Sequence, residues 1–109
     1  MYNVTAIIGM FKRDDRGEDH ISTPLFALAA GMDHDDVIST VLQNTNVFEE
    51  LNISSVTGTY VDPDGYAFAV LNEAQAKALL MMIEPTTDDY PRFASAFLKA
   101  MKLREGISV

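Results

Sequence analysis

The chain has 109 residues, 48% of them apolar, with no cysteine and a net charge of −8 from sixteen acidic and eight basic residues. This length predicts one small domain with a modest core, and the lack of cysteine excludes disulfides, thiolate zinc sites and cysteine nucleophiles. No apolar stretch approaches the roughly 20 residues of a membrane helix. Basic residues follow the first apolar run, opposite to a signal peptide. We therefore expect a soluble, cytoplasmic protein without membrane contact.

The charges are unevenly distributed. Basic residues occur at Lys12, Arg13 and Arg16, and the next is Lys77. Between Arg16 and Lys77 lie ten acidic residues: Glu18, Asp19, Asp33, Asp35, Asp36, Glu49, Glu50, Asp62, Asp64 and Glu73. Binding to a phosphate backbone draws most of its affinity from Lys and Arg. The middle of the chain should therefore repel DNA unless the termini or a partner compensate.

The N-terminal segment, residues 1–21, predicts a β-hairpin. Residues 2–12 are rich in β-branched and aromatic side chains with partial alternation, which favours a strand. The polar cluster RDDRGED that follows is typical of a turn. His20 and Ile21 then form a short return strand, in which we interpret His20 as a strand-edge or loop residue.

Residues 22–52 predict a helix-turn-helix. Thr23 is placed to cap a short helix with Pro24 at its first position, and Gly31 ends it. Asp33 is placed to cap a second helix with an apolar face of Val37, Ile38, Val41 and Leu42. Val47, Phe48 and Leu51 either continue this helix or form a further turn.

The exposed face of the second helix would be the recognition surface, since in a helix-turn-helix this helix lies in the major groove. Its side chains are polar and hydrogen-bonding, and none is basic. The candidate residues of this helix and its cap are Asp33, His34, Asp35, Asp36, Ser39, Thr40, Gln43 and Asn44.

Residues 53–71 predict the wing of a winged helix. Two β-rich runs, 56–61 and 66–70, flank Asp62-Pro63-Asp64-Gly65, whose proline and glycine suit a tight turn. Tyr60 and Tyr66 flank this turn, and each is either half of a cross-strand pair or an exposed anchor. The candidate contact residues of the wing are Tyr60, Asp62, Asp64 and Tyr66.

Residues 72–105 predict two helices. Asn72 caps the first, whose Leu79, Leu80, Met82 and Ile83 are expected to be largely buried, and Pro85 ends it. The second begins between residues 88 and 91 and runs to about Arg104. Its expected inner side chains are Phe93, Phe97, Leu98 and Met101. The predicted fold is therefore α+β: a winged helix-turn-helix with an N-terminal β-hairpin and two C-terminal helices, forming one domain over residues 1–109.

The inventory of catalytic and metal-binding groups is small. The chain has two histidines and neither a glycine-rich phosphate loop nor a serine elbow, so we expect no enzyme and no cofactor. Asp33 and Asp36 can share a helix face, but carboxylates at a helix start are also favoured by the helix dipole. Asp62 and Asp64 lack the spacing of a calcium loop and are interpreted as a turn. We expect no metal site.

The segment GYAFAVLNEAQAKALLMMI, followed by a helix ending FLKAMKLRE, resembles the phage regulatory protein Rha family. STPLFALAAGMDHDDVISTVLQN resembles the helix-turn-helix of that family, with His34 and Val37 at matching positions. The resemblance covers about residues 20–104 and implies a winged-helix fold, a phage or prophage origin, a bacterial host cell and DNA binding. Where the family carries lysine or arginine around the histidine, this chain has Asp33, Asp35 and Asp36.

Three functional hypotheses follow. The resemblance favours a regulator that binds DNA directly, with the second helix reading bases. The charge distribution favours a non-enzymatic phage regulatory protein whose acidic helix binds a basic protein surface, as an inhibitor or DNA mimic of a host or defence factor. The third is an assembly module that forms homodimers or larger oligomers through its wing and last helices. We expect a basic protein partner rather than DNA.

Overall fold

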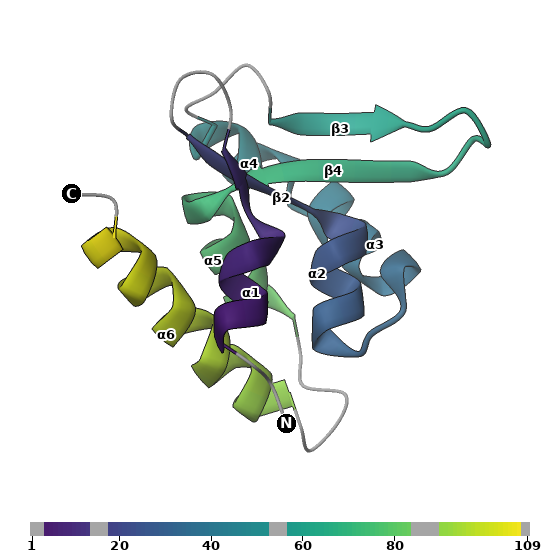
Figure 1. The fold of residues 1–109 in the computed structure, drawn as a ribbon. Helices are drawn as coiled ribbons and strands as arrows, with labels where there is room; N and C mark the ends of the chain where they lie inside the picture. The colour runs from purple at the N-terminus through teal and green to yellow at the C-terminus, as the bar shows by residue number, and fades with distance from the viewer. Residues whose placement is uncertain (1–3, 14–17, 53–56, 84–89, 108–109) are drawn as a thin grey trace.

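A computed structural model describes residues 4–13, 18–52, 57–83 and 90–107. These residues form an α+β fold, as predicted, with six helices and one four-stranded antiparallel sheet (Figure 1). In chain order the elements are α1 (Val4–Met10), β1 (Lys12–Arg13), β2 (Asp19–Ser22), α2 (Thr23–Ala30), α3 (His34–Gln43), α4 (Thr45–Glu50), β3 (Gly58–Val61), β4 (Ala67–Asn72), α5 (Glu73–Met82) and α6 (Tyr90–Ile107).

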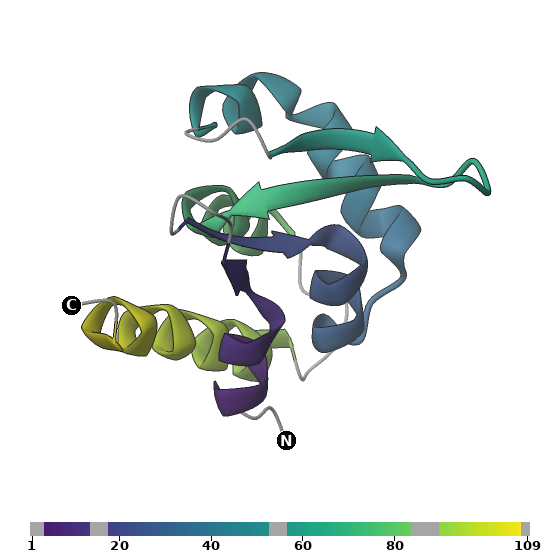
Figure 2. The same cartoon turned by 45° about the horizontal axis from the view of Figure 1, so that its top comes forward.

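The sheet has the strand order β1-β2-β4-β3, so two strands distant in sequence, β2 and β4, lie side by side at its centre. Ile21 pairs with Leu71 across these strands, and both side chains are buried in the core. Successive side chains of a strand point to opposite faces. The sheet therefore buries one face, and Figure 2 shows α3 and α5 behind the sheet on the side away from the viewer.

The N-terminal segment differs from its prediction. Residues 4–10 are helical, and the hairpin is reduced to β1 and β2, with Lys12 opposite His20. Ile7 and Phe11 stand one helical turn apart and are both buried, and the Phe11 ring lies 5.9 Å from that of Phe97 on α6. The β propensity of this segment is weak and context-dependent, and packing against α6 overrides it. His20 is only 6% exposed, in a strand between two neighbours, so it is not a strand-edge residue.

The two predicted helices of residues 22–52 are confirmed, together with the turn between them. Gly31 adopts a left-handed conformation (φ 69°), and Met32 N–H donates to the carbonyl of Ala27, which closes the end of α2. Asp33 caps α3 by accepting from the N–H of Asp35. The cap of α2 is Ser22 and not Thr23, which lies inside the helix with its hydroxyl turned into the core.

The segment after α3 forms a separate short helix, α4, whose end is held by the start of α5. Asn72 and Gln75 form a reciprocal capping box at the start of α5, as the predicted cap at Asn72 allows. The same two side chains also donate to α4: Asn72 Nδ2 to the carbonyl of Leu51 at 2.7 Å, and Gln75 Nε2 to that of Phe48 at 2.6 Å. The side chains of Asn72 and Gln75 therefore cap the start of α5 and also bind carbonyl groups at the end of α4.

The hairpin predicted around residues 62–65 is confirmed, with β3 and β4 in antiparallel register. Asp62 Oδ1 accepts from the N–H groups of Asp64 and Tyr66, and Gly65 takes a positive φ of 88°. These contacts make residues 62–65 a tight turn built around the Asp62 side chain. Strand β4 ends at Asn72, one residue beyond the expected end of the segment at Leu71. Strand β3 begins at Gly58, and its expected start at Val56 lies outside the described residues.

The core is centred on aromatic side chains of α2 and α6. The ring of Phe26 contacts those of Phe93 and Phe97 at 5.5 and 5.6 Å, and all three residues are at most 1% exposed. Met101 is buried on the same side of α6, as predicted, but Leu98 is 44% exposed. Phe93, Phe97 and Met101 recur every fourth residue along one face, and Leu98 lies about 100° around the helix from Phe97. Helix α6 ends at Ile107, later than expected, and the first two of its expected starting positions, 88 and 89, lie outside the described residues.

Tyr90 links α6 to α5, because its hydroxyl donates to the carbonyl of Leu80 at 2.8 Å. Burial raises the pKa of Tyr90 from 10.0 to about 12. The unfolded chain therefore loses this proton at lower pH than the folded chain, so stability should fall as the pH rises from 10 towards 12. We expect the titration of Tyr90 to lower the free energy of unfolding by about 1 kcal/mol between pH 9 and pH 11.

Urea unfolding of the wild type, Tyr90→Phe and Tyr66→Phe at both pH values measures this loss of stability. Tyr66 is 69% exposed and serves as the control. The stability difference between wild type and Tyr90→Phe should shrink at pH 11, and that for Tyr66→Phe should not change. If the stability difference between the wild type and Tyr90→Phe did not depend on pH, the raised pKa of Tyr90 would be contradicted.

Candidate functional site

A groove runs along the outer side of α3, between this helix and the end of α5. It has a volume of about 460 Å³. Its lining residues are Met32, Asp36, Ser39, Thr40, Gln43, Asn44, Met82 and Ile83. Five of them are polar residues of α3 and its C-cap that the sequence predicts as recognition residues. The structure therefore brings most of the predicted recognition face to one surface depression.

Two of the polar side chains that line this groove are held by hydrogen bonds, and two others are exposed. Thr40 Oγ1 donates to the carbonyl of Asp36, and Asn44 Nδ2 donates to the carbonyl of Thr40, so both are bonded to their own helix. Ser39 and Gln43 are exposed. Asp36 is the only charged residue among the described residues that line the groove. The arrangement presents hydrogen-bonding groups and one carboxylate to a partner.

The other two aspartates of the predicted site lie outside the groove. Asp33 is exposed and caps α3, and Asp35 is exposed on the first turn. With Asp36 they give the start of α3 three carboxylates. Their negative charge interacts favourably with the positive end of the helix dipole, which explains why the fold tolerates them together.

His34 does not face outward with the predicted recognition residues. Its Nε2 lies 2.8 Å from Thr23 Oγ1, which is fully buried and also accepts from the N–H of Ala69 at 3.0 Å. A hydroxyl group has one proton and two lone pairs, so Thr23 can donate to this ring nitrogen or accept from it, depending on the tautomer of the imidazole. The histidine therefore connects α3 to α2 and to β4, and its role here is structural.

Replacing Thr23 with valine tests this connection, because valine keeps the shape and removes the hydroxyl. The buried N–H of Ala69 would lose its partner, so we expect the free energy of unfolding to fall by about 1–3 kcal/mol. Thr59→Val, at an exposed position of β3, is the control and should change little. Equal denaturation midpoints for the two variants would contradict the structural role of Thr23.

The predicted wing residues lie on the β3–β4 hairpin and line no part of the α3 groove. Tyr60 stacks on Phe68, its cross-strand partner, at 5.6 Å, and is 39% exposed. Tyr66 is 69% exposed. Asp62 holds the turn, and Asp64 is exposed beside it. The hairpin therefore forms a surface separate from the groove.

Sequence reasoning missed the apolar part of the groove. Met82 and Ile83 were expected only as core residues of the helix after the wing, yet they form one wall of the groove opposite α3. Methionine adapts its shape to different contacts. No local sequence signal indicates that the end of α5 meets the outer side of α3, because this contact depends on the tertiary arrangement.

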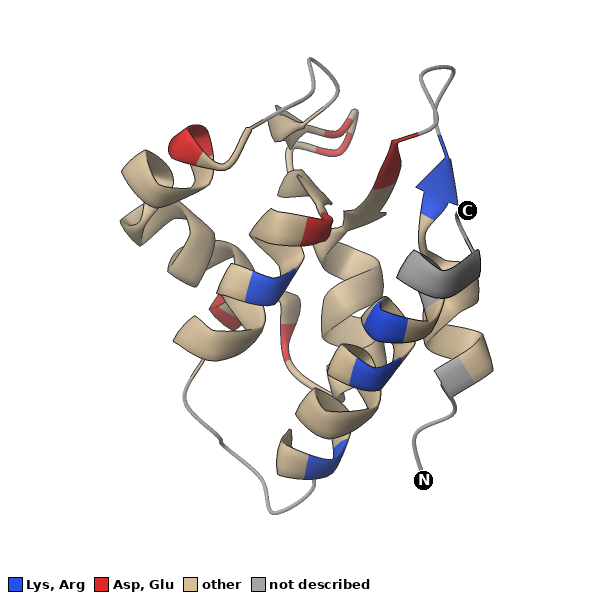
Figure 3. Cartoon of the chain, turned by 90° about the vertical axis from the view of Figure 1, so that its left-hand side faces the viewer, with Lys and Arg blue, Asp and Glu red and all other residues tan. Residues whose placement is uncertain are grey.

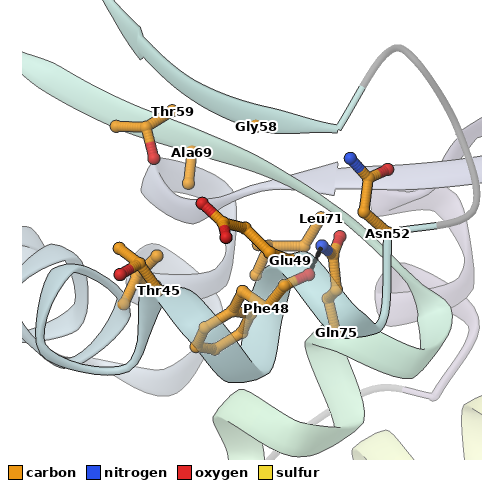
Figure 4. Close-up of a pocket in the computed structure, with 10 residues that line it drawn as sticks. Thr45, Phe48, Glu49, Asn52, Gly58, Thr59, Ala69, Leu71 and Gln75 are labelled. Carbon is orange, nitrogen blue, oxygen red and sulfur yellow. Dashed lines mark hydrogen bonds between the residues drawn. The ribbon is translucent and has the colours of Figure 1, made fainter.

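A second, smaller pocket lies between α4 and the hairpin (Figure 4). Its volume is about 110 Å³. The lining residues are Val41, Thr45, Phe48, Glu49, Asn52, Gly58, Thr59, Ala69, Leu71 and Gln75. The sequence gives no motif for this pocket, since its walls come from α3, α4, α5 and both strands of the hairpin.

No described lysine or arginine lies on α3, on α4 or on the β3–β4 hairpin. Figure 3 shows Lys and Arg on β1, α5 and α6, whereas Asp and Glu mark the starts of α3 and α5, the end of α4, the turn of the β3–β4 hairpin and β2. Arg13 is also paired with Asp19 at 3.2 Å. Among the described residues, α3, α4 and the hairpin therefore carry Asp and Glu but no Lys or Arg, and the basic residue of the groove's other helix, α5, is Lys77.

Within the described part of the chain, no three histidine or carboxylate side chains are grouped so that they could hold a metal ion. The helices of that part are also too short or too polar to span a membrane. Comparison with protein-family models, with curated proteins and with solved structures gives no match. The resemblance to the Rha family therefore stays a prediction.

Proposed function

We propose that this chain is a non-enzymatic regulatory protein that binds a basic surface of another protein through the α3 groove and the acidic start of α3. The observation that carries the proposal is the charge of this surface: Asp35 and Asp36 are exposed, and Asp36 is the only charged residue among the described lining residues. Electrostatic complementarity of this kind favours a positively charged partner and accelerates association.

The order of elements supports the interpretation of the fold as a winged helix. A strand leads into α2 and α3, and the hairpin β3–β4 follows, with β4 pairing back onto the first strand β2. In a helix-turn-helix the second helix carries the recognition residues. On this interpretation a Rha-like protein of phage or prophage origin has kept the recognition helix and changed its charge, which suits an inhibitor or DNA mimic acting on a host or defence factor.

Direct DNA binding is the second candidate, favoured by the exposed amide of Gln43 and hydroxyl of Ser39 on α3. Both groups can contact base edges. However, none of the described lysines and arginines lies on α3; they lie on β1, α5 and α6. Phosphate contacts supply most of the affinity for DNA, so we expect protein binding instead.

Fluorescence anisotropy of labelled duplexes, tiled over the region upstream of the gene, separates the two candidates. The protein is titrated at about 50 and then at about 200 mM salt. We expect no saturable binding at the lower salt concentration. Saturable binding that weakens steeply with salt would overturn the protein-binding proposal, and Gln43→Ala would then test whether α3 reads the bases.

A further inference from the structure

We infer that the pocket between α4 and the hairpin receives a lysine or arginine side chain of the proposed partner. This inference rests on the proposed function and adds a specific contact to it. The pocket joins an apolar interior to one carboxylate, the combination that a long cationic side chain requires. Such side chains bury their methylene stems on apolar surface and keep the charged end in a polar environment.

The interior of the pocket is apolar and firmly held. Val41, Phe48, Ala69 and Leu71 line it and are each at most 5% exposed. The buried Gln75 amide donates to the carbonyl of Phe48 and accepts from the N–H of Asn72, so its polar atoms are already bonded. An apolar stem is therefore a better occupant for the interior than a polar group.

The rim of the pocket carries its charge. Glu49 is the only charged residue among the described lining residues, and its side chain extends from α4 towards Thr59 and Ala69 on the hairpin (Figure 4). Thr45 and Thr59 add hydroxyl groups to the same rim. A carboxylate beside hydroxyl acceptors suits an ammonium or guanidinium group, which carries several N–H donors and no acceptor.

The size of the pocket selects one side chain and excludes larger groups. About 110 Å³ is well below the roughly 300–1,000 Å³ of sites that enclose drug-sized ligands. Glu50, the next residue, is also exposed but does not line the pocket. This neighbour provides a matched control, because Glu49→Gln and Glu50→Gln change the net charge by the same amount.

The test uses small molecules that copy the two side chains. The amide resonances of the ¹⁵N-labelled protein are followed while n-butylammonium, n-propylguanidinium or uncharged n-butanol is added. We expect saturable shifts at Gly58, Thr59 and Ala69 with the cations and binding at least fivefold weaker with n-butanol. Glu49→Gln should weaken the binding of the cations at least fivefold, and Glu50→Gln should leave it unchanged. The cation that binds more tightly identifies lysine or arginine as the occupant.

Two results would overturn the inference: an absence of shifts at these amides, or equal responses of the two glutamine variants. Partner binding then separates this inference from the proposed function. If Asp35→Asn with Asp36→Asn abolishes partner binding and Glu49→Gln does not affect it, the pocket inference fails and the proposed function stands. If the cations bind at Glu49 but the two aspartates do not affect the partner, the proposed function fails and the pocket remains a cation site.

Discussion

Phe97→Ala should lower the free energy of unfolding by about 3–5 kcal/mol, the range for removing a fully buried phenylalanine. Phe97 is 1% exposed, and its ring contacts those of Phe11, Phe26 and Phe93. These partners lie on α2, on α6 and at the end of α1. Loss of the ring leaves a cavity where three helices meet, and the surrounding chain can fill it only partly.

Leu98→Ala, one residue further along α6, provides the control. Leu98 is 44% exposed, so the same substitution type at this position should cost less than about 1 kcal/mol. Chemical denaturation of both variants, with the slope of the transition held common, measures the difference. Similar losses at the two positions would contradict the placement of α6 against α1 and α2.

Gln75→Glu should lower the free energy of unfolding by about 2–4 kcal/mol at neutral pH, since the change buries a charge and removes a hydrogen-bond donor. Gln75 is 3% exposed, and its Nε2 donates to the Phe48 carbonyl at 2.6 Å. A carboxylate keeps the bond from the Asn72 N–H but places negative charge against that carbonyl. The substitution should therefore weaken the attachment of α4 to α5 and the packing of the pocket that Phe48 and Gln75 line.

Lowering the pH should partly restore the stability of Gln75→Glu. Burial raises the pKa of the introduced carboxyl group, and its protonated form can donate to the carbonyl of Phe48. Its stability deficit relative to the wild type should therefore grow as the pH rises through that pKa. Gln43→Glu, at an exposed position of α3, is the matched control and should show a change within about 0.5 kcal/mol. A deficit of equal size for both variants would mean that Gln75 does not connect α4 to α5.

The predictable parts of the fold are those with local signals. Gly31 and Asp33 mark the end of one helix and the start of the next, and both act as expected. Asn72 caps α5, and the turn at residues 62–65 closes the hairpin. Each of these features depends on residues within a few positions of one another, so the sequence carries the information directly.

The unpredictable parts depend on contacts between distant residues. Residues 4–10 form a helix because Ile7 and Phe11 pack against the rest of the core, which no local pattern reveals. His34 turns inward because Thr23, bonded to Ala69 46 residues away, offers it a partner. The α3 groove and the pocket at Glu49 are likewise assembled from separate elements, so only their polar α3 residues were found from the sequence.

The central claim is that the acidic start of α3 binds a basic protein, and charge-matched variants test it most directly. Asp35→Asn with Asp36→Asn, and Glu50→Gln with Asp64→Asn, each change the net charge from −8 to −6, since each pair removes two carboxylates. All four residues are exposed, and the Asp33 cap is left intact. The two variants should therefore fold alike.

The measurement is the dissociation constant of a partner captured by the wild-type protein from a bacterial lysate, determined for all three proteins. We predict that the partner is basic, that the α3 variant binds it at least tenfold more weakly, about 1.4 kcal/mol, and that the control variant binds it within twofold of the wild type. Equal affinities for the two variants would contradict the claim, because binding would then follow net charge rather than the α3 surface.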